Sequence, residues 1–198
     1  NEGMIIAGEE LLETKGIFGT GGALTVNNTG AITAEDGIYT NNSSITINNN
    51  IDGVILGIVK EGSSWQASKG IYVNDTSATT TIINAGKISG IGTGIYVVGA
   101  DTTITNTGTI SGTGALPDGS IHLLSEGIHL FSGGTVTNSG SITGIKHGIS
   151  SKSGTATITN TGTISGGDSD INNNSQLTLY NEQGKDGSDP LTLSGKLP

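Results

Sequence analysis

The stretch TITNTGTISG occupies residues 103–112 and occurs again, unchanged, at residues 157–166. Close variants stand at residues 81–90 (TIINAGKISG), 135–144 (TVTNSGSITG) and 25–34 (TVNNTGAITA). When the copies are aligned on their shared asparagine, most successive asparagines are 21 or 22 residues apart. The series consists of Asn28, Asn49, Asn84, Asn106, Asn138, Asn160 and, less regularly, Asn181. A repeat of this length indicates a solenoid in which each copy forms one coil.

Within each copy the residues alternate in the manner of a β-strand. In residues 103–112, Ile104 and Asn106 fall on one face of an extended chain, and Ile110 returns to that side after a corner at Gly108. No apolar stripe recurs at helical spacing. Two or three short strands in each coil of about 22 residues predict a right-handed parallel β-helix. The chain is long enough for about seven such coils, stacked roughly 4.8 Å apart.

The repeat also predicts what fills the interior of the solenoid. One ladder of stacked side chains would consist of Val26, Ile47, Ile82, Ile104, Val136, Ile158 and Leu179. A second would consist of Ile32, Ile88, Ile110, Ile142 and Ile164, and a third of Ile17, Ile38, Ile71, Ile95, Ile128, Ile149 and Ile171. Such β-branched ladders can fill a narrow core in a chain with only 4% aromatic residues. We expect the asparagine side chains to hydrogen-bond from coil to coil, as stacked amides do in cross-β assemblies.

A second marker, the dipeptide Gly-Ile, accompanies the asparagine in almost every coil. Strand alternation predicts that the residue after this marker points outward. These residues are Phe18, Tyr39, Tyr72, Tyr96, His129, Ser150 and Asn172. An exposed aromatic series can stack on sugar rings or on a partner protein. It can equally well be an ordinary cross-strand stack that stiffens one face of a sheet.

Two coils are longer than the others, and their extra residues fall at the same corner, between the first strand and the Gly-Ile marker. The insertions lie within residues 54–69 and 113–126. In the first of these coils Ile51 replaces the corner glycine and Gly53 follows. Inserted corner loops often form the binding face of a solenoid, although local packing explains them too. Together with the outward series they give the candidate ligand-binding residues, which are Tyr39, Tyr72, Tyr96, His129, Trp65, Lys60 and His122.

The two ends depart from the regular array, which spans residues 16–182. Residues 1–15 are interpreted as a degenerate coil or cap, with Ile6 in the asparagine position and Gly8 at the corner. Residues 183–198 are expected to leave the repeat. An uncovered end of a β-helix exposes strand edges, so these segments also bear on end-to-end association.

The composition excludes several classes of function. The chain has no cysteine, a formal charge of −9 and eight basic residues, all of them lysines, which makes it a poor partner for nucleic acid. No apolar run is long enough to insert into a membrane. Glu35 and Asp36 are adjacent, so we expect their side chains to diverge and not to act as a catalytic pair. Residues 168–179 lack the glycine and the glutamate that a calcium-binding loop requires. We therefore predict no catalytic site, no metal and no cofactor.

The repeats TITNTGTISG, TVTNSGSITG and TIINAGKISG, each followed by a Gly-Ile strand, resemble the passenger regions of Gram-negative autotransporter adhesins. The similarity covers about residues 16–181, and LTLSGKLP at residues 191–198 resembles segments that follow such arrays. It implies secretion through an outer-membrane barrel, display on the bacterial cell surface and adhesion or aggregation. The implied partners are a glycan or protein on a host or neighbouring cell, or copies of the chain itself.

Three functions are therefore compared with the structure. The first is a surface-displayed or secreted adhesive β-helix. The second is the subunit of a self-assembling extracellular filament. The third is a polysaccharide-active β-helix enzyme or a phage-type fibre, which would be favoured by acidic residues gathered in one groove.

Overall fold

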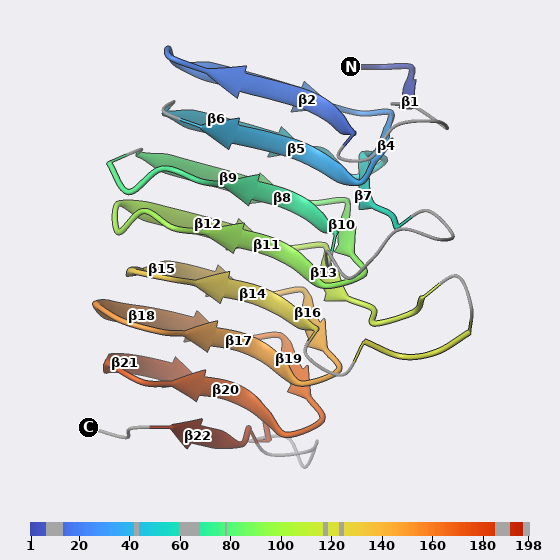
Figure 1. Ribbon diagram of the computed structural model, residues 1–198. Coiled ribbons are helices and arrows are strands. Elements are labelled where there is room, and N and C mark those ends of the chain that lie inside the picture. The colour runs from blue at the N-terminus through green and yellow to red at the C-terminus, as the bar shows by residue number, and fades with distance from the viewer. Residues whose placement is uncertain are drawn as a thin grey trace.

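The computed structural model describes residues 1–6, 14–41, 44–59, 68–77, 79–116, 119–122, 125–184 and 191–195, and this part of the chain consists of strands and turns. The strands form three parallel sheets, named here A, B and C (Figure 1). Sheet A contains β1 (Met4–Ile6), β4 (Ala31–Ala34), β7 (Val54–Gly57), β10 (Lys87–Gly90), β13 (Thr109–Gly112), β16 (Ser141–Gly144) and β19 (Thr163–Gly166).

Sheet B contains β2 (Lys15–Thr20), β5 (Asp36–Asn41), β8 (Lys69–Val73), β11 (Thr93–Val97), β14 (Glu126–Leu130), β17 (His147–Ser151), β20 (Ser169–Asn173) and β22 (Leu193–Gly195). Sheet C contains β3 (Leu24–Asn28), β6 (Ile45–Asn49), β9 (Thr80–Asn84), β12 (Thr102–Asn106), β15 (Gly133–Asn138), β18 (Thr155–Asn160) and β21 (Gln176–Asn181). The chain passes through A, B and C in turn, so one strand of each sheet makes one coil.

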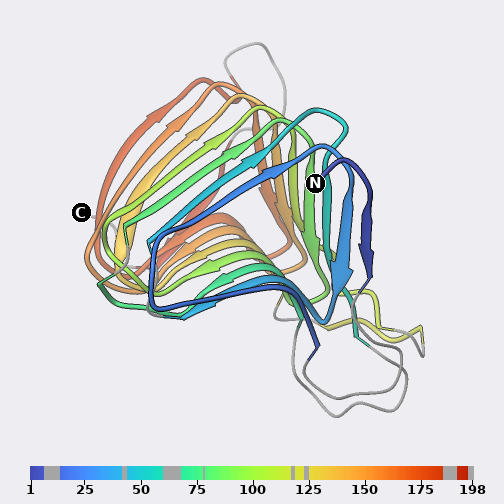
Figure 2. The same ribbon diagram turned by 90° about the horizontal axis from the view of Figure 1, so that it is seen from above.

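The coils wind in one direction around a common axis. Seen from the N-terminal end, the chain turns clockwise as it recedes from the viewer, which is a right-handed helix (Figure 2). Sheets A and C each have seven strands in the described part of the chain, and sheet B has eight because β22 begins a further layer. The structure thus confirms the predicted right-handed parallel β-helix.

The three predicted ladders form most of the interior, which also contains Ile45, Val73, Val97 and Leu130. Ile104 pairs with Ile82 and Val136, and Ile110 pairs with Ile88, so these inward β-branched residues lie at the same level of successive strands. These side chains are buried along most of the helix, so each coil covers the apolar residues of the next. The structure adds Ile5 and Ile55 to the second ladder and Leu193 to the third.

The Gly-Ile marker has a steric explanation. A Cβ atom on Gly94 would lie 2.7 Å from the carbonyl oxygen of Gly127 and 2.8 Å from Cγ2 of Ile110, where no side chain fits. The equivalent glycines of the neighbouring coils meet the same kind of obstacle. The glycine and the isoleucine therefore both face inward at the bend between sheets A and B. As a result, the residue before the marker and the residue after it both face away from the core. Four of the residues before the marker are nevertheless buried on that side, namely Asp36, Thr93, His147 and Ser169.

The asparagine ladder is a continuous chain of buried hydrogen bonds. Asn106 donates from Nδ2 to Oδ1 of Asn138 at 2.8 Å, to the carbonyl of Gly108 at 3.1 Å and to that of Ser141 at 3.2 Å. Equivalent amide-to-amide bonds of 2.7 or 2.8 Å link Asn28 to Asn49, Asn49 to Asn84, Asn84 to Asn106, Asn138 to Asn160 and Asn160 to Asn181. The ladder therefore ties side chains to the backbone at the same corner of every coil, as predicted.

The structure corrects the predicted register at the N-terminal end. Asn1, and not Ile6, occupies the asparagine position, because its Nδ2 donates to Oδ1 of Asn28 at 3.2 Å and to the carbonyl of Gly3 at 3.0 Å. The corner is Gly3, whose carbonyl accepts from the amide of Ala31 at 3.0 Å. Residues 1–5 (NEGMI) in fact match the NTGTI core of the repeat. The expected corner glycine, Gly8, lies outside the described residues.

A similar correction applies to the first long coil. Gly53 occupies the corner, since its carbonyl accepts from Nδ2 of Asn49 at 3.0 Å and from the amide of Lys87 at 2.9 Å. Ile51 instead belongs to a local bulge and is 79% exposed. Asn49 and Gly53 are four residues apart, whereas Asn84 and Gly86 are two apart, so two extra residues lie at this corner and outside the predicted insertion. Strand β7 is regular, so the remaining extra residues follow Gly57.

Both long connections leave sheet A and enter sheet B, as the alignment of the repeats predicts. The first joins β7 to β8 and the second joins β13 to β14. In the second, Ala115 and Ile121 form an isolated antiparallel bridge, and this segment projects from the body of the helix (Figure 2).

The C-terminal segment does not simply leave the repeat. Strand β22 pairs with β20, with Leu193 beside Ile171. Below sheet A the side chain of Gln183 takes the place of a strand, because its Oε1 accepts from the amide of Ile164 at 2.8 Å and its Nε2 donates to the same residue's carbonyl at 3.0 Å. The C-terminal end of sheet A is therefore capped by a side-chain amide.

Candidate functional site

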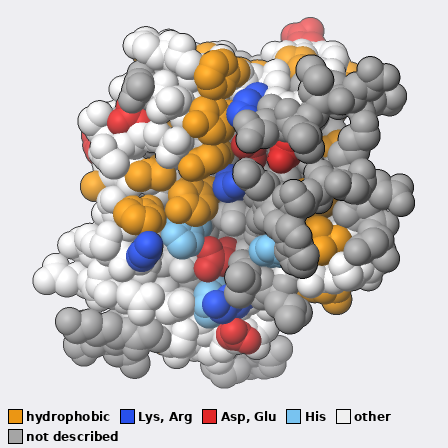
Figure 3. Space-filling view, viewed as in Figure 1, with side chains coloured by type: hydrophobic (Ala, Val, Ile, Leu, Met, Phe, Trp, Pro, Cys, Tyr) orange, Lys and Arg blue, Asp and Glu red, His pale blue; other side chains and the backbone are white. Residues whose placement is uncertain are grey.

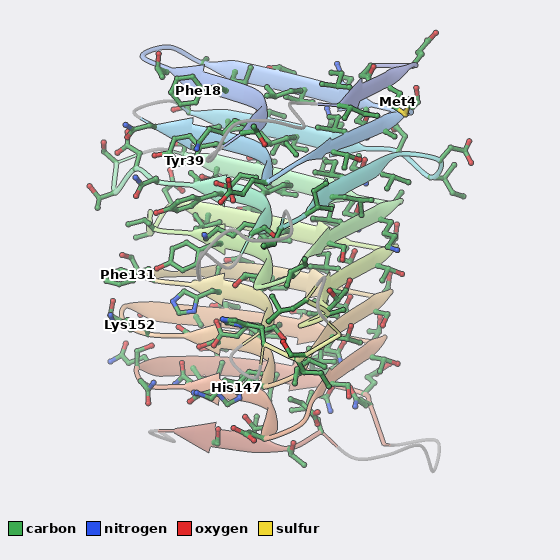
Figure 4. All side chains as sticks on the ribbon, turned by 45° about the vertical axis from the view of Figure 1, so that its right-hand side comes forward. Met4, Phe18, Tyr39, Phe131, His147 and Lys152 are labelled. Atoms are coloured by element: carbon green, nitrogen blue, oxygen red, sulfur yellow. The ribbon has the colours of Figure 1, made fainter. Side chains whose placement is uncertain are left out.

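Five rings stand in one column on the outer face of sheet B. This ring ladder consists of Phe18, Tyr39, Tyr72, Tyr96 and His129, one from each of five consecutive strands. Figure 3 shows the column as a band of hydrophobic side chains down the front of the molecule, with charged and histidine side chains beside it. In Figure 4, Phe18 and Tyr39 lie one above the other at the N-terminal end of this face. The sequence prediction that these residues share an outer face is confirmed.

The rings contact one another in three ways, one of which is the tilted pair of Phe18 and Tyr39, with centroids 5.5 Å apart. Tyr96 and His129 stack with centroids 4.6 Å apart and planes 3° apart, so each covers a face of the other. Tyr72 instead stands edge-on to both Tyr39 and Tyr96, with centroids 5.1 and 5.2 Å away. Much of the ring surface is therefore used within the ladder, which stiffens sheet B. Phe18, at the end of the column and 59% exposed, presents the most ring surface to solvent.

A second column, which the sequence analysis missed, runs parallel to the rings. It is formed by the residue that precedes each Gly-Ile marker, and we call it the polar ladder. Its members are Lys15, Asp36, Lys69, Thr93, Glu126, His147 and Ser169. Because the two residues of the marker both face inward, the polar ladder and the ring ladder emerge on the same outer surface. Reading the residue before the marker in each repeat would have revealed it.

The two ladders enclose a cavity of about 400 Å³ at the N-terminal half of sheet B. The described residues that line it are Lys15, Phe18, Glu35, Asp36, Tyr39, Asn41, Lys69 and Tyr72. Lys15 Nζ lies 5.2 Å from the ring centroid of Tyr39, and Lys69 Nζ lies 4.8 Å from that of Tyr72. These are cation–π distances, so the lysines of one ladder are held against the rings of the other.

Asp36 lies at the centre of the charged part of this cavity. Its Oδ1 accepts a hydrogen bond of 3.0 Å from the amide of Lys69, so the carboxylate replaces a backbone carbonyl between β5 and β8. Burial raises the pKa of Asp36 and outweighs the opposing effects of the Lys69 charge, the Lys69 amide and the Lys15 charge. Burial likewise raises the pKa of Tyr72 and Tyr96, whose hydroxyl groups are therefore neutral at physiological pH.

Further along the two ladders the side chains pair with each other. His129 Nδ1 lies 2.5 Å from Oε2 of Glu126, while its buried Nε2 has no hydrogen-bond partner in the described part of the chain. His147 is hydrogen-bonded through Nδ1 to Ser169 at 2.9 Å and through Nε2 to Asn172 at 3.1 Å. The C-terminal half of the face is thus a network of internal polar contacts.

The structure separates the remaining candidates from this face. Ser150, which we expected to be exposed, is buried, because its short side chain lies between the larger His129 and Asn172 on neighbouring strands. His122 lies in the second long connection, where its amide donates to Gly114 at 2.7 Å, and no contact joins it to His129. Trp65 and Lys60 fall outside the described residues.

The acidic residues are arranged differently from the expectation. Glu35 and Asp36 line the same cavity, although their adjacency suggested that they would diverge. Asp170 is committed to the fold, because Oδ1 accepts from the amide of Gly166 at 3.0 Å and Oδ2 from that of Thr192 at 2.7 Å. Within the described ranges no three histidine or acidic side chains are grouped as metal ligands would be.

Comparison of the chain with protein-family models, curated proteins and solved structures finds no match. Among the described residues there is also no helix of the length and apolar character needed to cross a membrane.

Proposed function

We propose that the chain is an adhesive β-helix, displayed on a bacterial surface or secreted, and that the outer face of sheet B is its contact surface. The observation that carries this proposal is the pairing of the ring ladder with the polar ladder around a cavity of about 400 Å³. Elsewhere most outward positions carry Thr, Ser and Asn, so this face combines aromatic and charged groups in a way that suits recognition.

Two further features support this choice. Both long connections join sheet B at the polar ladder, because the strands that they enter, β8 and β14, begin at its members Lys69 and Glu126. The repeats also resemble those of autotransporter passengers, and we extend to this chain the secretion route and surface display that the resemblance implies. A rigid rod stabilised by internal ladders is well suited to carry a contact surface away from a cell.

Self-assembly into a filament is the second candidate, and one observation favours it. Strand β21 is the last strand of sheet C in the described part of the chain, and its residues Leu177 and Leu179 are only partly buried. An open edge with apolar side chains can pair with a strand from another copy. Pairing of β21 with β3 of a second copy would place Leu179 of one molecule beside Val26 of the next and would require Asn1 to move away from Asn28.

A polysaccharide-cleaving role has weaker support. Glycosidases place two carboxyl groups on opposite sides of the bond that they cleave. Glu35 and Asp36 are consecutive residues at the start of one strand, so they approach the cavity from one side.

The adhesion proposal is tested by binding of the purified chain to a glycan array and to immobilised extracellular-matrix proteins. The wild-type chain is compared with a variant in which both long connections are shortened to the ordinary coil length, and with a variant carrying Phe18→Ser and Tyr72→Ser. We expect binding by the wild type and its loss in the serine variant. If binding is lost only in the variant with shortened connections, the contact surface lies in the connections and not on the two ladders.

The filament alternative is examined on the same samples by light scattering and electron microscopy. A monomeric chain that binds glycans or matrix proteins supports adhesion. A chain that binds nothing and forms filaments lengthening with concentration would replace the adhesion proposal with the assembly role.

A further inference from the structure

We infer that the cavity between the two ladders binds a neutral pyranoside, and that Asp36 and Phe18 are its principal contacts. This inference rests on the proposed adhesive function and specifies the chemical class of its ligand. It concerns the N-terminal half of sheet B, where the cavity lies, and not the paired C-terminal half of the face.

The size and walls of the cavity suit a sugar ring. A volume of about 400 Å³ is at the lower end of the range for small-molecule sites. One wall is aromatic, with Phe18 tilted 30° against Tyr39 and exposing the rest of its ring to solvent. The carbon–hydrogen face of a pyranose can pack on such a ring, as other apolar groups do. The polar ladder, on the same face of sheet B, forms another part of the lining and supplies hydrogen-bonding groups.

The hydrogen-bonding groups that line the cavity include both donors and acceptors. Asp36 and Glu35 accept, Lys15 and Lys69 donate, and Asn41 does both. Oδ1 of Asp36 accepts from the amide of Lys69, and Oδ2 is the second acceptor of the same carboxyl group. A sugar hydroxyl both donates and accepts one hydrogen bond or more, so a polyhydroxylated ring matches this mixed set of partners.

The charge balance decides between neutral and acidic sugars. Among the described residues that line the cavity are two lysines and two carboxyl groups, whose formal charges cancel. Lys69 and Lys15 both act electrostatically on Asp36, which means that the cations are already close to an anion of the protein. An acidic sugar would have to displace this internal pairing in a chain whose net charge is −9. The cavity therefore favours a ligand without charge.

The test uses the purified chain labelled with nitrogen-15 and titrated with the methyl glycosides of glucose, galactose, mannose and N-acetylglucosamine. The amide of Lys69 is the reporter, because its hydrogen bond to Asp36 places it beside the proposed contact. We expect at least one neutral glycoside to shift the Lys69 and Phe18 amide signals in a saturable manner. The dissociation constant should be insensitive to added salt, since the ligand carries no charge to screen.

Two variants test the named contacts. Asp36→Asn keeps an acceptor for Lys69 but removes the charge-assisted bond to a hydroxyl, so we expect roughly tenfold weaker binding. Phe18→Ser removes the exposed ring and should weaken binding by roughly two- to tenfold. The matched control is Tyr180→Phe, an exposed ring position on sheet C, which should bind as the wild type does. Thermal unfolding of each variant verifies that it is folded.

The outcomes distinguish this inference from the adhesive function on which it rests. Adhesion that persists while no neutral glycoside shifts the reporter signals would overturn the inference and leave the function intact. Shifts caused only by the methyl glycosides of glucuronic or sialic acid, and abolished by salt, would overturn it as well. Neutral glycosides that bind equally well to the Asp36→Asn and Phe18→Ser variants would show that another part of the face binds them. If the wild-type chain itself does not adhere, the proposed adhesive function is wrong.

Discussion

At the scale of the residue, the fold depends on burying an amide at the same corner of every coil. A buried polar group is costly unless it is hydrogen-bonded, and an asparagine has both donors and an acceptor to satisfy. The ladder solves this because the neighbouring coil supplies an identical amide at the required distance. Asparagine is the only common side chain that can donate to the next coil, accept from the previous one and still reach the backbone of its own corner.

The central member of the ladder gives a direct test. Asn106→Ala removes the donor to Asn138 Oδ1 and the acceptor for Asn84 Nδ2, and it leaves a void. We expect the free energy of unfolding to fall by about 2–4 kcal/mol, measured by denaturant titration. The control is Asn48→Ala, which breaks an exposed amide bond of 2.8 Å to Asn27 and should change stability by less than about 0.5 kcal/mol. Equal losses in the two variants would contradict a special role for burial.

Asp36 predicts a pH dependence with a definite sign. Burial raises its pKa in the folded chain, so the folded state holds this proton more tightly than the unfolded state does. Its contribution to stability is therefore greatest below the usual aspartate pKa of about 3.9 and is lost as the pH rises through the higher folded-state value. Denaturant titrations from about pH 3 to pH 6 should show the wild type losing stability relative to Asp36→Asn. If the wild type keeps or gains stability relative to the Asp36→Asn variant as the pH rises, this assignment is wrong.

At the scale of the element, the sequence predicted most of the strands because each strand is repeated. The three isoleucine ladders and the asparagine series could be read directly, since every copy in residues 103–112 or 157–166 gives the same alternation. The ring ladder followed from the same alternation. The polar ladder could not be predicted in this way. The two inward residues of the Gly-Ile marker break the alternation, so that Lys15, Asp36 and Lys69 also face the outer side of the sheet.

The ends and the cavity were harder to predict for physical reasons. At the N-terminal end Asn1 and Gly3 are separated from the array by residues that do not follow the repeat, so the register was assigned to Ile6 instead. At the C-terminal end Leu193 returns to sheet B after a stretch without the motif. The cavity depends on side chains from three strands, and the sequence alone does not show that Asp36 reaches the amide of Lys69.

The cap at the end of sheet A provides a prediction about a single element. Gln183→Ala removes the side-chain amide that pairs with both backbone groups of Ile164 on β19. We expect the Ile164 amide to exchange with solvent roughly tenfold faster, as measured by hydrogen exchange, because one hydrogen bond is lost at a strand edge. Gln176→Ala, an exposed glutamine on β21, is the control and should leave this amide unchanged. Unchanged protection of Ile164 in the Gln183 variant would mean that another group covers the edge.

At the scale of the whole molecule, the solenoid is a stack of units that contact only their neighbours. Stability then approximates a sum over coils and over the interfaces between them. The two long connections do not alter the stack, because β7 and β8, and likewise β13 and β14, keep their register with the adjacent coils. Function can therefore vary on the outer face of sheet B while the interior remains constant.

This additivity predicts that one whole coil can be removed without loss of the fold. Deleting residues 141–162 joins Gly140 to Thr163, which occupies the same position as Ser141 in the preceding coil, so all ladders continue in register. We expect a folded β-helix with a lower denaturant midpoint and a denaturant slope reduced by roughly a tenth, in proportion to the surface lost. Deleting only residues 141–151 removes β16 and β17 but keeps β18, so a strand of sheet C would follow directly on the corner that should begin sheet A. Circular dichroism and denaturant titration should then show no cooperative unfolding, because the ladders on either side of the deletion no longer meet. If the half-coil deletion folds as well as the full-coil deletion, register between coils is not what stabilises the molecule.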